Sequence, residues 1–228
     1  MLASLTIMLF FSDFRSPTSD LSGRVMFMEL RIIDITKDLI TTKPYPGDPA
    51  PELSVFSSIS GGDSCNMAML TTTLHAGTHA DAPLHFLDNG ASVNNVPLEK
   101  FIGECRVVEI PADMITGAVV DEYFPKGEKK ILIKSGGKAF FEKTGAEAAA
   151  YLGYDLIGID SNSIGSPADQ KNPHRAILGE GIAVLENLDL SQVKAGKYFL
   201  AAFPLKIQGV EASPVRAVLL DGYLFWSN

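Results

Sequence analysis

The chain has 228 residues, of which 46% are hydrophobic and 20% are charged, a composition that excludes a disordered polypeptide. Its formal charge is −8, from 19 Lys and Arg against 27 Asp and Glu, so we expect no nucleic-acid partner. No apolar run reaches the ~18 residues of a membrane-spanning helix, so we expect no membrane partner either. Cys65 and Cys105 lie far apart and form neither a CxxC nor a zinc-finger spacing, which indicates two free thiols in a reducing compartment.

The first 28 residues precede the regular hydrophobic pattern. Leu2–Phe11 is a short apolar stretch, but no Lys or Arg precedes it and no clear cleavage site follows it. Met26 and Met28 are possible later starts of translation. We therefore interpret residues 1–28 as an upstream extension, with a secretory signal as the alternative, and we expect residues 29–228 to form one cytoplasmic domain.

Short runs rich in β-branched and apolar residues predict strands along this whole domain. They lie at residues 30–36, 52–60, 67–74, 105–110, 130–134, 155–160, 182–186, 197–207 and 215–220. The second and third runs flank a Gly-Gly-Asp turn, and the alternation of Met67 and Met69 predicts side chains in the core or in a pocket wall. Two loops are expected, over the proline-rich residues 43–51 and the polar residues 161–173.

One helix is expected between two of these strands. Thr144 and Glu147 have the spacing of a capping box, and an Ala-rich segment continues to about Leu152. Gly153 is a plausible end of the helix. A helix that leads into a buried strand ending at Asp160 is typical of α/β proteins, so the fold class is a single mixed α/β domain.

Three of the four histidines lie within eleven residues, together with one aspartate. His75, Gly77, His79, Asp81 and His85 share odd parity, so in an extended backbone their side chains point to one face. The helical alternative places the first two histidines on one face through their i,i+4 spacing. In either conformation two imidazoles and a carboxylate converge, as in the ligand set of a metal site. A hydrogen-bonded structural cluster is the alternative.

Motifs of other catalytic classes are absent from the sequence. There is no G-x-S-x-G nucleophile elbow, no G-x-G-x-x-G and no P-loop. Neither cysteine adjoins a histidine along the chain. The histidine cluster is therefore the best candidate for the chemistry of this protein.

The residues from His75 to Phe86, HAGTHADAPLHF, resemble the H-x-G-T-H-x-D-x-P-x-H-F signature of the cyclase-like metal-dependent hydrolases. Bacterial kynurenine formamidase is the best-known member of that family. Four further segments resemble the family's sequence in the same order, and the resemblance covers roughly residues 29–222. They are Tyr45-Pro-Gly-Asp48, Gly158-Ile-Asp-Ser161, Phe203-Pro-Leu-Lys206 and Ala212-Ser-Pro-Val-Arg-Ala217.

This resemblance implies a swivelling β/β/α domain that assembles as a homodimer or homotetramer. It also implies two divalent metal ions per subunit, usually zinc and in some relatives manganese. By matching positions, His75 and His79 would hold the first ion and His174 the second, while Asp81 and Glu186 would bridge both. These five residues are the metal ligands that we predict.

The resemblance further implies a hydrolase of non-peptide C–N bonds, of the arylformamidase type, that converts N-formyl-L-kynurenine into L-kynurenine and formate. His85 would be a proton shuttle, and Tyr45 falls where formamidases carry a substrate-contacting Trp. That difference leaves an isatin-type lactam, or another cyclic amide or ester, as an alternative substrate. An alternative from a different functional class is a metal-stabilised protein that binds a small ligand and catalyses no reaction. A free imidazole at His85 favours the enzyme.

Overall fold

A computed structural model of the chain describes residues 4–7 and 28–222. Most of the proposed extension, residues 1–28, lies outside this part. Its described residues, Ser4–Ile7, form strand β1, which pairs antiparallel with β2 (Met28–Asp34). Strand β2 is the first strand expected from the sequence, and it begins two residues before the predicted start.

One ten-stranded sheet organises the domain, in the order β1-β2-β14-β12-β6-β8-β10-β11-β5-β13. The four central strands are parallel, and every strand outside them pairs antiparallel with its neighbour. The central strands are β6 (Ile102–Glu109), β8 (Lys130–Lys134), β10 (Leu156–Ile159) and β11 (Ala183–Glu186). The flanking strands are β12 (Gly196–Ala201) and β14 (Val218–Asp221) on one side, and β5 (His79–Asp81) and β13 (Ala212–Pro214) on the other.

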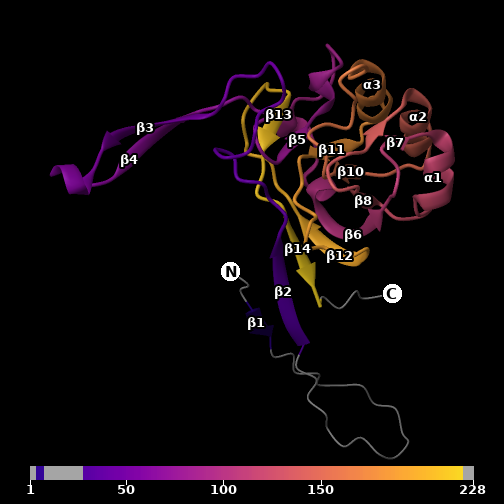
Figure 1. Ribbon diagram of the computed structural model, residues 1–228, viewed down its shortest axis with the longest axis horizontal. Coiled ribbons are helices and arrows are strands. Elements are labelled where there is room, and N and C mark those ends of the chain that lie inside the picture. The colour runs from indigo at the N-terminus through magenta and orange to yellow at the C-terminus, as the bar shows by residue number, and fades with distance from the viewer. Residues whose placement is uncertain (1–3, 8–27, 223–228) are drawn as a thin grey trace, which may run out of the picture.

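Three helices lie together on one side of the central strands (Figure 1). They are α1 (Gly117–Tyr123), α2 (Lys143–Tyr151) and α3 (Lys171–Gly179). Alternate side chains of β8 and β10, among them Ile131 and Ile157, share a buried cluster with helix residues such as Ala146 and Ile177. The strands are buried on both faces, which is why they are continuous apolar runs in the sequence.

The opposite face of the central strands packs against the antiparallel part of the same sheet. Leu132 and Leu185, from the central strands, share a second buried cluster with Ile33, Leu200 and Leu219, from β2, β12 and β14. The sheet therefore curls over its own core and the helices form an outer layer, which gives two β layers and one α layer. The expected mixed α/β class is confirmed.

The predicted capping box at Thr144 is wrong. Helix α2 begins at Lys143, two residues earlier than an N-cap at Thr144 implies; its N-cap is Glu142, and no side chain caps it. Gly145 lies in the first turn of this helix, where a Cβ would lie 1.9 Å from the Ile115 carbonyl oxygen. The first turn must approach that backbone closely. The end is as expected, since Gly153 has φ +72°.

Helices α1 and α3 were not expected. Helix α3 begins at Lys171, inside the segment that the sequence suggested is a polar loop, and it carries His174. Several short elements complete the body of the domain and its connections. They are strands β7 (Met114–Ile115) and β9 (Phe140–Phe141), and 3-10 turns at Ile59–Gly61, Pro83–His85, Val93–Asn95 and Leu98–Phe101. Among the described helices, none has the length and hydrophobicity needed to span a bilayer.

A β-hairpin projects from the body of the domain (Figure 1). It consists of β3 (Glu52–Ser57) and β4 (Met67–Thr71), which pair antiparallel as a separate two-stranded sheet, and we call residues 52–71 the arm. The sequence predicted both strands, with longer bounds. The prediction that Met67 and Met69 are core or pocket residues is wrong, because both side chains are exposed. Among the described residues, no second layer covers the arm.

Candidate metal centre

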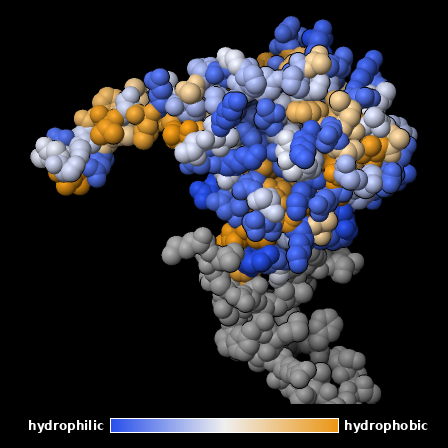
Figure 2. Space-filling view, in the orientation of Figure 1, coloured by the Kyte–Doolittle hydropathy of each residue, from blue (hydrophilic) through white to orange (hydrophobic). Residues whose placement is uncertain are grey.

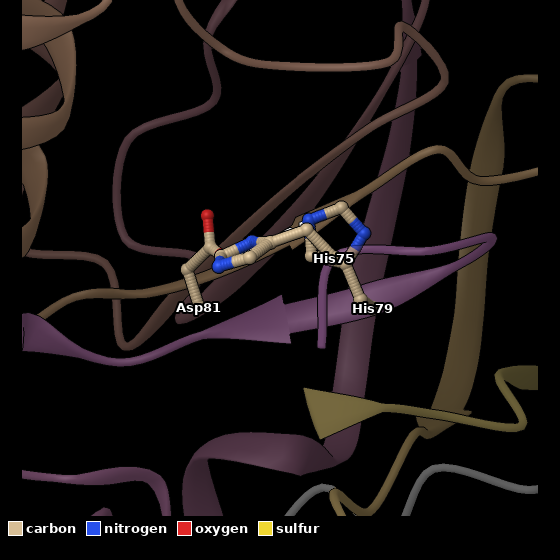
Figure 3. A group of neighbouring side chains, drawn as sticks. All are labelled: His75, His79 and Asp81. Atoms are coloured by element: carbon tan, nitrogen blue, oxygen red, sulfur yellow. Dashed lines mark ion pairs between the residues drawn. The ribbon is translucent and has the colours of Figure 1, made fainter. Parts of the chain in front are cut away.

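Strand β5 places the centre of the histidine cluster in the sheet. It lies between β11 and β13, and its first residue, His79, stands directly opposite Glu186 in the register. Because His79 and Asp81 are two positions apart in a strand, their side chains rise from the same side (Figure 3). The extended alternative is therefore correct for residues 79–81 and the helical one is wrong, while His85 lies in the 3-10 turn Pro83–His85. His75 reaches the same point from the turn before the strand.

The five predicted ligands converge around the two carboxylates. One oxygen of Asp81 lies 3.0 Å from Nδ1 of His75 and 3.5 Å from Nε2 of His79, and the other lies 3.7 Å from Nε2 of His174. Glu186 lies 3.3 Å from His79 and 3.2 Å from His174 through its two oxygens. Each carboxylate thus faces at least two imidazoles, which is the arrangement expected of groups that bridge two ions.

Backbone carbonyls orient two of the imidazoles. Nδ1 of His79 donates to the Gly77 carbonyl at 3.0 Å, and Nδ1 of His174 donates to the Gln170 carbonyl at 2.6 Å. These bonds leave Nε2 of each ring as the atom with a free lone pair, and both atoms point at the carboxylates. A hydrogen bond that fixes the tautomer in this way is typical of metal-ligating histidines.

The charges of the cluster shift the pKa values of its members. Burial lowers the pKa of His75, but the negative charge of the Asp81 carboxylate, 3.0 Å from Nδ1, outweighs burial and raises the pKa to about 9. Burial likewise lowers the pKa values of His79 and His174, and the two carboxylates outweigh it and raise both. Burial raises the pKa of Glu186, and its two histidine neighbours hold it well below the usual range. Since cations and protons compete for the same lone pairs, a metal ion bound here would displace protons.

The donor set fits divalent cations. Nε2 of His79 and both carboxylate oxygens of Asp81 are buried and have no hydrogen-bond partner among the described residues. Buried polar atoms are nearly always satisfied, so these three indicate that an ion belongs between them. Two groups of side chains are close enough to hold a metal ion, and they share one carboxylate. They are His75, His79 and Asp81, and Asp81, His85 and His174.

His85 lies on the rim of this cluster. Its ring centroid is 4.2 Å from that of His75 and 5.5 Å from that of His174, and its side chain is partly exposed. Burial and the two neighbouring imidazoles lower its pKa more than Asp81 raises it. This shift favours the neutral imidazole, and the ring lies beside the predicted ligands. The geometry also permits it to be a ligand.

A cavity of about 230 Å³ opens onto the cluster. His75, His79, His85 and Glu186 line one part, and the sequence-predicted Tyr45 lines another. The remaining lining residues are Asp48, Phe86, Asn162, Ser163 and Gln170. A larger hollow of about 650 Å³ lies elsewhere, along α2 and α3, and it contains none of the clustered histidines. The smaller cavity is therefore the candidate active site.

Sequence reasoning missed three side chains that support the cluster. Ser163 donates to Glu186 at 3.0 Å, Gln170 donates to the Tyr45 hydroxyl at 3.0 Å, and Glu211 lies 3.5 Å from His75. Glu211 could have been found, because it directly precedes the Ala212–Ala217 segment that resembles the family. The other two lie in the polar loop, where no local pattern distinguishes them.

Asn187 is a further supporting residue that the sequence did not reveal. It follows Glu186 in the left-handed region, with φ +61°, which is uncommon for a residue other than glycine. Lys37 donates to its side chain at 2.9 Å, and Thr78 donates to its carbonyl at 2.6 Å. The ammonium of Lys37 also donates to the Asp160 carbonyl at 3.0 Å. These bonds hold the backbone in place next to a predicted ligand.

Comparison with known proteins identifies the family. The family model described as "Putative cyclase" matches residues 20–166, more than half of the chain. The chain belongs to this cyclase family. A relative from Delftia acidovorans named kynurenine formamidase is 38% identical over 211 residues, which cover 84% of this chain and 98% of that protein. The family resemblance seen in the sequence is thus confirmed.

Solved structures of other proteins share the fold. A predicted metal-dependent hydrolase from Bacillus stearothermophilus superposes with a TM-score of 0.73 at 26% identity, covering 84% of this chain and 98% of its own. Isatin hydrolase A from Labrenzia aggregata superposes with a TM-score of 0.72 at 20% identity, covering 85% and 94% of the two chains. The second likeness supports the fold alone.

Proposed function

We propose that this protein is a metal-dependent amide hydrolase of the arylformamidase type, which converts N-formyl-L-kynurenine and water into L-kynurenine and formate. The observation that carries the proposal is the convergence of three imidazoles and two carboxylates around buried atoms that have no hydrogen-bond partner among the described residues. The relative from Delftia acidovorans supports the formamidase substrate, since the two chains align over nearly the whole of that protein.

Two divalent ions per subunit, zinc in our proposal and manganese as the alternative, would be held by the five predicted ligands. His75 and His79 would hold one ion and His174 the other, with Asp81 and Glu186 shared between them. Such ions, when bound, supply Lewis-acid polarisation of a carbonyl and water acidic enough to attack it near neutral pH.

The side chains of the cavity position the substrate and move its protons. The formamide group enters between the cluster and Tyr45, whose hydroxyl is fixed by Gln170. The neutral imidazole of His85 accepts a proton from water and transfers it to the departing aryl amine. Water contributes the hydroxyl of formate and the proton of the amine, so the reaction balances without a further reactant.

A lactam of the isatin type is the second candidate substrate, because Tyr45 stands in the cavity where a Trp was expected and ring opening needs the same proton transfers. A protein that binds a small ligand without catalytic turnover is the third candidate function. We further propose that the protein is cytoplasmic and works as a homodimer or homotetramer.

A hydrolysis panel on metal-loaded protein tests these proposals. N-formylkynurenine, isatin, simple aryl formamides and lactones are offered, and formate or ring-opened product is measured together with bound metal by elemental analysis. We expect about two equivalents of zinc or manganese and the highest kcat/KM with N-formylkynurenine. A preference for isatin would reassign the substrate, and full activity of metal-free protein would refute the metal centre.

A further inference from the structure

The active-site cavity has one carboxylate that the metal cluster does not use. Two acidic side chains line the cavity, and one of them, Glu186, already faces His79 and His174. The other, Asp48, is exposed, and among the described residues no group donates a hydrogen bond to its carboxylate or forms an ion pair with it. Figure 2 shows a mostly hydrophilic surface on the body of the domain, so an exposed carboxylate is common there. Asp48 differs because it lines the cavity in which the substrate is expected.

A β-turn fixes the position of Asp48 relative to Tyr45. The N–H of Asp48 donates to the carbonyl of Tyr45 at 3.0 Å, which closes the turn. Its two central residues are Pro46 and Gly47, and Gly47 has φ +104°, as is typical of a type II turn. The hydroxyl of Tyr45 accepts from Gln170 at 3.0 Å, which anchors the first residue of the turn to the cavity wall. Backbone bonds therefore hold Asp48 beside the cavity and leave its carboxylate open to a ligand.

No cationic side chain of the cavity balances this charge. The described residues that line the cavity include neither Lys nor Arg. A carboxylate that borders a binding cavity without a cation of its own can pair with a cationic group of the ligand, and such charge-assisted hydrogen bonds are stronger than neutral ones. The ligand that fits best therefore carries a positive charge at the end that lies beside Asp48.

We propose that Asp48 binds the α-ammonium group of N-formyl-L-kynurenine and thereby selects an amino acid as substrate. This inference rests on the proposed function, in which the formamide group lies at the metal cluster. Six bonds separate the formamide nitrogen of this substrate from its amino nitrogen, a span of roughly 5–7 Å. A compact cavity of 230 Å³ is about 8 Å across, so one molecule can reach both ends. The substrate's carboxylate then faces solvent, because no cation of the described lining receives it.

The charge of Asp48 also predicts which formamides are poor substrates. A formamide that has a carboxylate and no ammonium places a second negative charge near Asp48, and like charges at short range repel. A neutral formamide is neither attracted nor repelled. We therefore expect Asp48 to favour the zwitterion over the neutral compound and the neutral compound over the anion.

The isosteric substitution Asp48→Asn tests this selection. It removes the charge and keeps the size of the side chain, while Asp121→Asn makes the same change at an exposed position on α1, outside the cavity. Metal-loaded proteins are assayed at neutral pH on three formamides of 2-aminophenyl ketones. They are N-formyl-L-kynurenine, 4-(2-formamidophenyl)-4-oxobutanoate, which lacks the ammonium, and 2-formamidoacetophenone, which lacks both charges.

The expected effect of Asp48→Asn differs among the three substrates. KM for N-formyl-L-kynurenine should rise roughly 10-fold with little change in kcat, because one charge-assisted hydrogen bond outside the reacting group is lost. KM for the anionic substrate should fall several-fold, and KM for the neutral one should stay the same. Asp121→Asn should match the wild type on all three substrates.

Salt dependence gives a readout that a role in the turn alone would not move. Ionic strength screens an exposed ion pair, so KM of the wild type for N-formyl-L-kynurenine should rise with added salt, and KM of Asp48→Asn should not. The wild-type part of this measurement needs no variant, and it therefore tests the proposal even if Asp48→Asn does not fold. Circular dichroism checks the fold of both variants.

Binding of the products tests the contact without turnover. By calorimetry, Asp48→Asn should bind L-kynurenine roughly 10-fold more weakly than the wild type and bind 2-aminoacetophenone equally well. An unchanged affinity for L-kynurenine, or an equal loss for both compounds, would overturn the proposal, as would equal changes in KM on all three substrates. A wild type that hydrolyses none of the three formamides would instead refute the proposed function, and the calorimetry distinguishes the two failures.

Discussion

Replacing His85 by alanine should separate proton transfer from metal binding. The ring lies 4.2 Å from His75 and 5.5 Å from His174, between centroids, yet it is not one of the five metal ligands that we predict. A positioned imidazole contributes roughly 10²–10⁴ to a rate, which corresponds to about 3–5 kcal/mol of activation free energy. We expect kcat to fall by that factor while KM changes little.

Metal content gives the second readout, and His174→Ala is its matched control. Both variants remove one imidazole from the same cluster, but only His174 directs its Nε2 at both carboxylates. His85→Ala should retain about two equivalents of metal in elemental analysis, whereas His174→Ala should lose metal and activity together. Added imidazole should restore part of the rate of His85→Ala without changing its metal content.

Two outcomes would contradict this role of His85. If His85→Ala loses metal, then His85 is a ligand, as its proximity to Asp81 and His174 permits. If neither metal content nor rate changes, the proton donor is another group in the cavity. Substrates with a more acidic leaving amine should be less affected, because they need less protonation. An equal loss for all substrates would contradict a role in proton donation.

Three further experiments test the cysteines, the Lys37–Asn187 hydrogen bond and the first residues of the chain. In native protein at pH 8 a thiol reagent should modify the exposed Cys65 and spare Cys105, because burial raises the pKa of the latter to about 12 and keeps its thiol neutral; two modified thiols per folded chain would contradict this. Lys37→Met should lower the free energy of unfolding in urea by about 1–3 kcal/mol, because it leaves Asn187 without its side-chain partner, while exposed Lys138→Met should change it little. A chain that begins at Met28 should keep its metal content and turnover, and an insoluble product would show that the preceding residues belong to the domain.

The sequence predicted the parts of the centre that depend on local spacing. His79 and Asp81 alternate in a three-residue strand, as their parity indicated, and His75 reaches them from the adjacent turn. His174 and Glu186 lie far away along the chain, and only the family resemblance connected them to the same site. The sheet explains their position, because Glu186 stands opposite His79 in the pairing of β11 with β5.

Other features could not be predicted, for identifiable physical reasons. The N-cap of helix α3, Gln170, makes no capping bond, and the Asp169 carboxylate accepts from the Asn172 N–H instead. The helix also carries Pro173 in its first turn, so its first residues have the pattern of a loop. Met67 and Met69 alternate as they would in a half-buried strand, and nothing in that pattern shows that the arm leaves the body. Local periodicity predicts the conformation of a segment, but which surface covers it depends on contacts distant in the sequence.

The predicted ligands come from four separate parts of the fold: a turn, strand β5, helix α3 and strand β11. A bound ion would therefore act as a cross-link in a chain whose two cysteines are both free. Ligand linkage gives such an ion about 3–4 kcal/mol of stabilisation when free metal exceeds its dissociation constant by 100- to 1,000-fold. For a domain of this size that corresponds to a melting temperature higher by roughly 6–16 °C. The concentration of free metal would then set the stability of the folded state, independently of any substrate that the protein hydrolyses.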